Sequence, residues 1–313
     1  MMLACQFPGQ GAQSTGYLHR LPQHPVVSET LDEASQVLGT EVLALDTPDA
    51  LRSTVAVQTG LLVAGVVMVR VLADAGLVAD ISAGLSVGAY AAAVSCGALG
   101  FADALRMVRK RAELMEAAYP AGYGLAAISG LTEPQVEELA AQQAKEGLPR
   151  VYIGNVNAPR QIVMAGADAA LEALIERALA SGARKATRLA VSVPSHCELL
   201  ADAADQLTDY ARDIPFHTPR GIYVGNRRGR ALYDAQAIRD DLATNMRYTV
   251  RWFDALAVTL EMGATVVVEA PPGQVLTDLV RESWPETIAI ATSNIAPEQW
   301  VATVRRRLAA GGR

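Results

Sequence analysis

The stretch of this chain best suited to chemistry is Gly84-Leu85-Ser86-Val87-Gly88. Apolar residues from Ile81 lead into this G-x-S-x-G pattern and an alanine-rich helical run follows it, so the serine falls where a strand turns sharply into a helix. The two glycines allow so tight a turn, and free N–H groups at the start of the helix can stabilise a developing oxyanion. The pattern alone is weak evidence, but in this context it predicts a nucleophilic Ser86.

A serine nucleophile needs a base, and the chain offers four histidines, at positions 19, 24, 196 and 217. His19 and His24 lie in a polar N-terminal loop. His196 lies in Ser192-Val193-Pro194-Ser195-His196-Cys197, where the chain crosses between two predicted domains, and is preferred over His217 for that reason. No acidic residue stands out as a partner that could orient this histidine.

Length and composition are those of a globular protein with a substantial core. The chain has 313 residues, 51% of them apolar and 19% charged, and a net charge of −6, which argues against nucleic acid as a partner. Cys5, Cys96 and Cys197 lie in apolar contexts without metal-ligand spacing, so we expect buried free thiols. The uncharged run from Ser53 to Val69 contains Gln58 and two glycines and is interpreted as a buried helix, not a membrane span. With no signal-peptide pattern, the predicted location is cytoplasmic.

The order of predicted elements indicates an α/β fold with two domains. A short strand, Leu3 to Phe7, ends in the glycine-rich loop Pro8–Gln13, and strands alternate with helices elsewhere. Residues 122–192 instead follow a β-α-β-β-α-β order, typical of a ferredoxin-like unit, with its last strand expected over 185–193. We therefore predict a discontinuous large domain, 1–121 and 193–313, with an insert at 122–192.

The predicted helix from Phe101 to Tyr119 carries four basic residues. Three of them, Arg106, Arg109 and Lys110, are expected on a solvated face. The fourth is Arg111, for which the spacing alone suggests no special role.

Five motifs together resemble one family, the malonyl-CoA:acyl-carrier-protein transacylases. They occur in the family's order over nearly the whole chain and are Phe7-Pro8-Gly9-Gln10-Gly11-Ala12-Gln13, Gly84-Leu85-Ser86-Val87-Gly88, Arg111-Ala112-Glu113-Leu114-Met115, Val193-Pro194-Ser195-His196-Cys197 and Pro272-Gly273-Gln274-Val275-Leu276. The resemblance implies an α/β-hydrolase-like large domain with a ferredoxin-like insert, which agrees with the pattern above.

The resemblance also implies catalytic roles. Ser86 would attack a malonyl thioester and His196 would take its proton. The backbone N–H groups of Gln10 and Val87 would form the oxyanion hole, and the main-chain carbonyl of Asn245 would orient the histidine in place of an acid.

Malonyl binding is implied for two residues of the basic helix. Arg111 would pair with the malonyl carboxylate, a task suited to a bidentate and permanently charged group, and Met115 would contact the substrate. The resemblance implies malonyl-CoA as a substrate, a phosphopantetheine-type thiol on a carrier protein as the acceptor, no resident cofactor or metal, and no membrane partner.

Two residues depart from the family pattern. The usual Gly-His-Ser-x-Gly-Glu is replaced here by Leu85 before the serine and Ala89 after the second glycine. This variant, together with the stretches Leu21-Pro22-Gln23-His24-Pro25 and Leu43-Ala44-Leu45-Asp46-Thr47, resembles the epsilon subunits of biotin-independent malonate decarboxylases. The predicted function is therefore priming of that enzyme's carrier subunit through a malonyl-Ser86 intermediate. The alternatives are malonyl transfer to acyl carrier protein in fatty-acid or polyketide synthesis, a serine thioesterase or esterase, and a non-catalytic scaffold.

Overall fold

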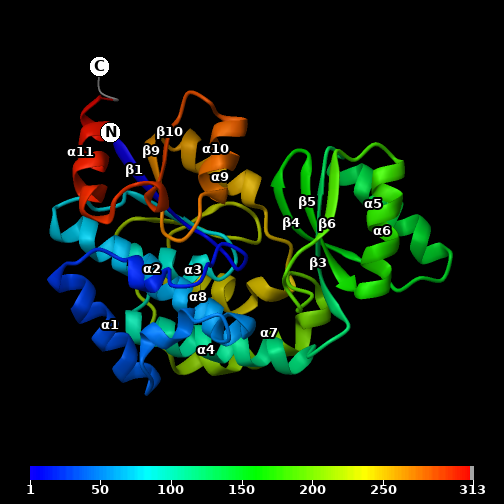
Figure 1. The fold of residues 1–313 in the computed structure, drawn as a ribbon, viewed down its shortest axis with the longest axis horizontal. Helices are drawn as coiled ribbons and strands as arrows, with labels where there is room; N and C mark the ends of the chain where they lie inside the picture. The colour runs from blue at the N-terminus through cyan, green and yellow to red at the C-terminus, as the bar shows by residue number, and fades with distance from the viewer. Residues whose placement is uncertain (311–313) are drawn as a thin grey trace.

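The protein contains a large, mainly parallel sheet and a small antiparallel one, in a computed structural model that describes residues 1–310 (Figure 1). The large sheet has the order β10-β9-β1-β2-β7-β8, with every pair parallel except β7 and β8. Its strands are β1 (Met2–Phe7), β2 (Ile81–Gly84), β7 (Ile222–Val224), β8 (Ala231–Leu232), β9 (Ala264–Glu269) and β10 (Ile288–Ala291). The predicted α/β fold class is confirmed.

Helices cover both faces of the large sheet, as a parallel sheet requires. The side chains of β1 alternate between these faces: Leu3, Cys5 and Phe7 belong to one apolar core and Ala4 to another. Helices α2, α3 and α11 contribute to the first core, and α9 and α10 to the second. The helices of this part are α1 (Pro25–Leu38), α2 (Thr54–Asp74), α3 (Gly88–Ser95), α4 (Phe101–Ala118), α7 (Ala201–Tyr210), α8 (Ala235–Thr244), α9 (Trp252–Glu261), α10 (Val275–Ser283) and α11 (Trp300–Ala310).

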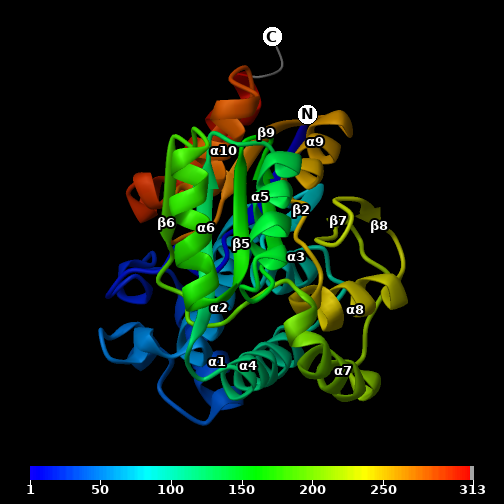
Figure 2. The same ribbon diagram turned by 90° about the vertical axis from the view of Figure 1, so that its right-hand side faces the viewer.

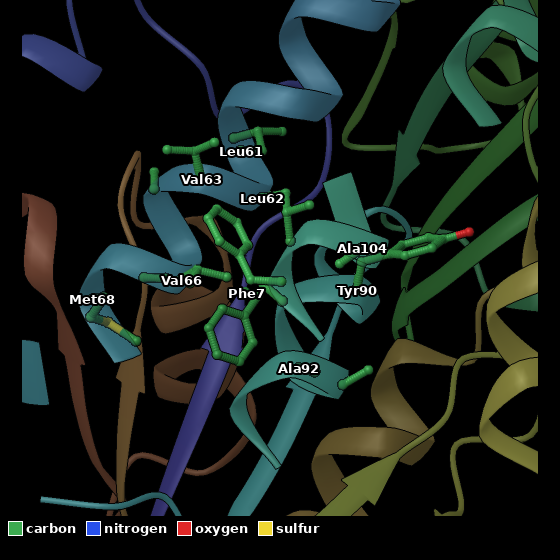
Figure 3. Packing of buried hydrophobic residues seen from close by; sticks show 14 of the residues in the cluster. Phe7, Leu61, Leu62, Val63, Val66, Met68, Tyr90, Ala92 and Ala104 are labelled. Carbon is green, nitrogen blue, oxygen red and sulfur yellow. The ribbon is translucent and has the colours of Figure 1, made fainter. Parts of the chain in front are cut away.

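Helix α2 is the central core element. It begins at the N-cap Ser53, whose hydroxyl accepts the Val55 N–H, and its apolar side chains surround Phe7 of β1 (Figure 3). By length and composition α2 could cross a membrane, but 83% of its most apolar window is buried inside the protein. The prediction of a buried helix is confirmed.

The small sheet follows the predicted β-α-β-β-α-β order. Its strands pair antiparallel in the order β4-β5-β3-β6, and β4 and β5 form the expected hairpin. Helices α5 and α6 cover its outer face, as Figure 2 shows. The elements are β3 (Tyr123–Ser129), α5 (Glu133–Lys145), β4 (Tyr152–Ala158), β5 (Gln161–Ala167), α6 (Asp168–Ala180) and β6 (Lys185–Arg188). The domain boundaries at 122 and 192 stay a prediction.

The last strand of this unit is shorter than predicted. We expected it over 185–193, but β6 ends at Arg188. The Leu189 N–H still donates to the Leu125 carbonyl, after which the chain leaves the sheet and runs back toward the large sheet. In this segment Leu189 and Val191 line a cavity and do not continue the pairing of β6 with β3.

Candidate active site

Ser86 lies in the sharp turn between β2 and α3. Its φ of 56° is in the left-handed region, which is unusual for a residue other than glycine. The flanking glycines are required by contact distances: a Cβ on Gly84 would lie 2.0 Å from the Gly88 carbonyl carbon, and one on Gly88 would lie 2.1 Å from the Phe7 oxygen. The predicted strand-turn-helix geometry around the serine is therefore present.

His196 reaches Ser86 from the segment that returns from the small sheet. Its Nε2 lies 2.7 Å from the Ser86 Oγ, and its Nδ1 lies 2.8 Å from the main-chain oxygen of Asn245. A carbonyl only accepts, so the Nδ1 carries the hydrogen and the Nε2 is left to accept the serine proton. The His196 N–H donates to the Met246 carbonyl at 2.7 Å, which holds the residue at a φ of 68°.

The surroundings of His196 keep its imidazole neutral. Burial, and secondarily the positive charge of Arg111, lower the pKa of His196 from its ordinary 6.5 to about 3, although the hydrogen bond to the Asn245 carbonyl acts in the opposite direction. At neutral pH the ring is unprotonated. It can act as a base as soon as a substrate is bound.

Arg111 is a fully buried cation beside Ser86. One Nη donates to the Ser86 Oγ at 3.1 Å and to the Asn245 Oδ1 at 3.2 Å, and the other donates to the Gln58 Oε1 at 2.6 Å. Within residues 1–310 it forms no ion pair, and its Nε has no protein acceptor. Burial lowers the pKa of Arg111, yet a guanidinium stays charged in proteins. The site thus holds a positive charge without a counterion from the described part of the chain.

The other basic residues of α4 lie elsewhere. Arg106 pairs with Asp103 and Arg109 with Glu113 on the exposed side of the helix, and Lys110 is half-buried. The expectation that three of the four arginines and lysines lie on a solvated face is confirmed for Arg106 and Arg109 and holds in part for Lys110.

A cavity of about 230 Å³ opens over Ser86, between the large sheet and the inner face of the small one. Its lining includes both Ser86 and His196, together with Gln10 from the loop after β1 and Met115 from α4. The rest of the lining is largely apolar and includes Leu125 and Val163 from the small sheet.

Two backbone N–H groups near Ser86 remain free for a ligand: that of Gln10, which lines the cavity, and that of Val87, the residue after Ser86. In the described part of the chain, neither the Gln10 nor the Val87 N–H has a protein acceptor. Gln10 belongs to the glycine-rich loop and Val87 stands at the start of α3, where the helix dipole favours negative charge. Their role as an oxyanion hole stays a prediction.

Sequence reasoning missed two polar residues of the site. Gln58 is fully buried in α2, where its Oε1 accepts from Arg111 and its Nε2 lies 3.5 Å from the Met115 Sδ. Asn226 contacts the turn around Ser86. A lone glutamine in an otherwise apolar helix was the available signal for Gln58, whereas nothing in the sequence marks Asn226.

Both departures from the family pattern lie close to Ser86 in the chain. Leu85 is half-buried, lines the cavity and packs against the core formed with α9 and α10. Ala89 is fully buried in α3. Neither side chain can donate or accept a hydrogen bond, so neither can take the place of the usual histidine or glutamate.

A serine hydroxyl 2.7 Å from a neutral histidine, which is oriented by a main-chain carbonyl, and two free N–H groups near that serine are the arrangement typical of serine enzymes of acyl transfer. A model of the acyl transferase domain matches residues 6–310, so the chain belongs to the acyl transferase family, and within it to the malonyl-CoA acyl carrier protein transacylases. It is an acyltransferase.

Relatives of known name cover almost the whole chain. The malonyl CoA-acyl carrier protein transacylase of Haemophilus influenzae is 36% identical over 300 residues, 94% of this chain and 96% of the relative. The acyl-carrier-protein S-malonyltransferase of Burkholderia pseudomallei superposes with a TM-score of 0.91 at 35% identity, covering 97% of this chain and all of the other. A malonyl-transacylase in complex with its type II PKS acyl-carrier protein superposes with a TM-score of 0.90 at 34% identity, covering 97% of this chain and all of the other.

Proposed function

We propose that this protein transfers a malonyl group from malonyl-CoA to the phosphopantetheine-type thiol of an acyl carrier protein. The observation that carries the proposal is Arg111, a fully buried guanidinium 3.1 Å from the Ser86 Oγ with no ion-pair partner among the described residues. A buried cation is costly unless it is paired. A malonyl group on Ser86 would supply the missing carboxylate.

The reaction follows a double displacement. Ser86 attacks the thioester carbonyl of malonyl-CoA while His196 Nε2 accepts its proton, and the Gln10 and Val87 N–H groups receive the oxyanion. Collapse of the tetrahedral intermediate breaks the C–S bond, and the imidazolium returns the proton to the CoA sulfur. The carrier thiol then repeats these steps in reverse on malonyl-Ser86.

The remaining site residues orient these groups. The Asn245 carbonyl fixes the tautomer of His196, at 2.8 Å from its Nδ1. Met115, 1% exposed and in the cavity wall, contributes apolar contact for the acyl chain. The chemistry needs no resident cofactor or metal because His196 handles each proton transfer. We expect the reaction to take place in the cytoplasm.

The acceptor is proposed to be the acyl carrier protein of fatty-acid or polyketide synthesis. The names of the relatives support this choice, and one of them is in complex with such a carrier. A second candidate acceptor is the carrier subunit of malonate decarboxylase, which is favoured by one observation: Leu85 and Ala89 stand where the transacylases usually have histidine and glutamate.

The deciding experiment incubates the purified protein with radiolabelled malonyl-CoA and, in separate reactions, each of the two holo-carriers. We expect label on acyl carrier protein and a transient labelled Ser86. Label on the decarboxylase carrier alone would replace the first acceptor by the second. Release of free malonate with neither carrier labelled would instead indicate a thioesterase.

A further inference from the structure

Asn226 closes the turn that carries Ser86 with a single side chain. Its Oδ1 accepts the Ser86 backbone N–H at 2.8 Å, and its Nδ2 donates to the Gly84 carbonyl at 2.9 Å. A primary amide offers an acceptor and a donor from one planar group, so it can hold both ends of the turn at once. Both bonds lie beneath the nucleophile, on the backbone and not on its hydroxyl.

This turn needs such support because Ser86 has a φ of 56°. A left-handed backbone at a residue with a Cβ is strained, and it persists only where the surrounding structure holds it. The position of the Ser86 Oγ relative to His196 depends directly on that backbone conformation. Loss of the two Asn226 hydrogen bonds would therefore displace the Ser86 Oγ relative to His196.

Asn226 is itself held firmly. It follows β7, which pairs in parallel with β2, so its side chain meets the turn at the carboxyl ends of two neighbouring strands. Its N–H donates to the Asp241 carboxylate at 3.1 and 3.2 Å, and its carbonyl accepts the Arg251 N–H at 2.9 Å. Only 3% of Asn226 is exposed.

Asp241 anchors this arrangement from α8. Besides the Asn226 N–H, its carboxylate accepts the Tyr223 hydroxyl at 2.8 Å and the Arg227 N–H at 3.3 Å. Three donors from the end of β7 thus converge on one buried carboxylate. The contact ties the segment that bears Asn226 to a helix instead of leaving it as a free loop.

We propose that Asn226, anchored by Asp241, is a positioning residue that fixes the backbone of Ser86 so that its Oγ faces His196. Asn226 does not line the cavity, so it acts through Ser86 and not on the acyl group. Its bond also occupies the Ser86 N–H, which directs the oxyanion to the Val87 N–H. The inference rests on the proposed function only in taking Ser86 as the nucleophile.

The test compares Asn226→Leu and Asn226→Asp with the wild type. Leucine removes both bonds at similar volume, whereas aspartate keeps the acceptor for Ser86 and sets a second oxygen against the Gly84 carbonyl. Two readouts are measured: the rate constant for labelling Ser86 with a fluorophosphonate, and kcat and KM with malonyl-CoA. We expect labelling and kcat to fall about 10- to 100-fold, the scale of a misplaced reacting group, with little change in KM.

Thr259→Val provides the matched control. It removes a buried hydroxyl bond to the Ala255 carbonyl within α9, a bond that involves neither Ser86 nor the Asn226 side chain, and should lower Tm without slowing labelling. This control separates lost stability from lost positioning.

Each outcome decides the inference. Unchanged labelling rates in both Asn226 variants, with a native circular dichroism spectrum, would overturn the proposed positioning role. Failure of both variants to fold would also overturn it, because Asn226 would then be needed for folding itself. Labelling does not require a malonyl group. A wild type that labels but transfers no malonyl would refute the proposed function, and the labelling comparison would still decide the role of Asn226.

Discussion

Replacing Arg111 by alanine should change which acyl group the enzyme prefers. The wild-type guanidinium is fully buried and donates to Ser86, Gln58 and Asn245. A malonyl carboxylate entering the cavity would complete an ion pair with it, whereas an acetyl group would leave the charge unpaired. Both effects favour the diacid, and both are lost in the variant.

The magnitude follows from the burial of the pair. Removing one partner of a buried ion pair costs ~3–4 kcal/mol, which is about two to three powers of ten in kcat/KM for malonyl-CoA. The variant also loses the bond to the Ser86 Oγ, a loss common to both substrates. The ratio of kcat/KM for malonyl-CoA to that for acetyl-CoA cancels this common term, so the ratio itself should fall by about two to three powers of ten.

The assay measures this ratio in the wild type, Arg111→Ala, Arg111→Lys and Arg109→Ala. Lysine should restore it only in part because an ammonium lacks the planar fork of donors. Arg109 lies two residues away on α4 and forms an exposed pair with Glu113, so its variant should match the wild type. A ratio that stays unchanged in Arg111→Ala would refute the reasoning and place the specificity on another residue.

Three further predictions concern the nucleophile, the base and the altered pattern. Ser86→Ala should carry no label from malonyl-CoA, and His196→Ala should acylate about a thousandfold more slowly; persistent label on the first variant would contradict the mechanism. The pKa of His196 is about 3 in the folded protein and 6.5 ordinarily, so between these pH values the unfolded chain binds a proton that the folded chain does not. The free energy of unfolding of the wild type, measured by urea unfolding, should therefore decrease relative to that of His196→Asn as pH falls from 6.5 toward 3. Leu85→His should alter kcat but leave the malonyl-to-acetyl ratio unchanged, since Leu85 does not bond to Arg111; a changed ratio would show that it contacts the acyl group.

The sequence by itself determined the elements that local pattern dictates. The apolar strand, two glycines and alanine-rich helix around Ser86 specify the turn, since no residue with a Cβ fits at Gly84 or Gly88. The β-α-β-β-α-β order came from periodicity alone. The end of β6 at Arg188 could not be predicted from periodicity, because the residues after it remain largely apolar although Leu189 and Val191 line the cavity and are not in the strand.

Only the tertiary structure decided how the site is assembled. The Ser86 bonds to His196 and Asn226 span 110 and 140 residues of sequence, and no local pattern encodes such pairings. The partner that orients His196 is a main-chain carbonyl, a group that every residue possesses and that no side-chain pattern can reveal. Arg111 looks in sequence like its solvated neighbours on α4. It becomes a buried cation, without an ion-pair partner among residues 1–310, only because the packing of α2 and α4 turns its face of the helix toward Ser86.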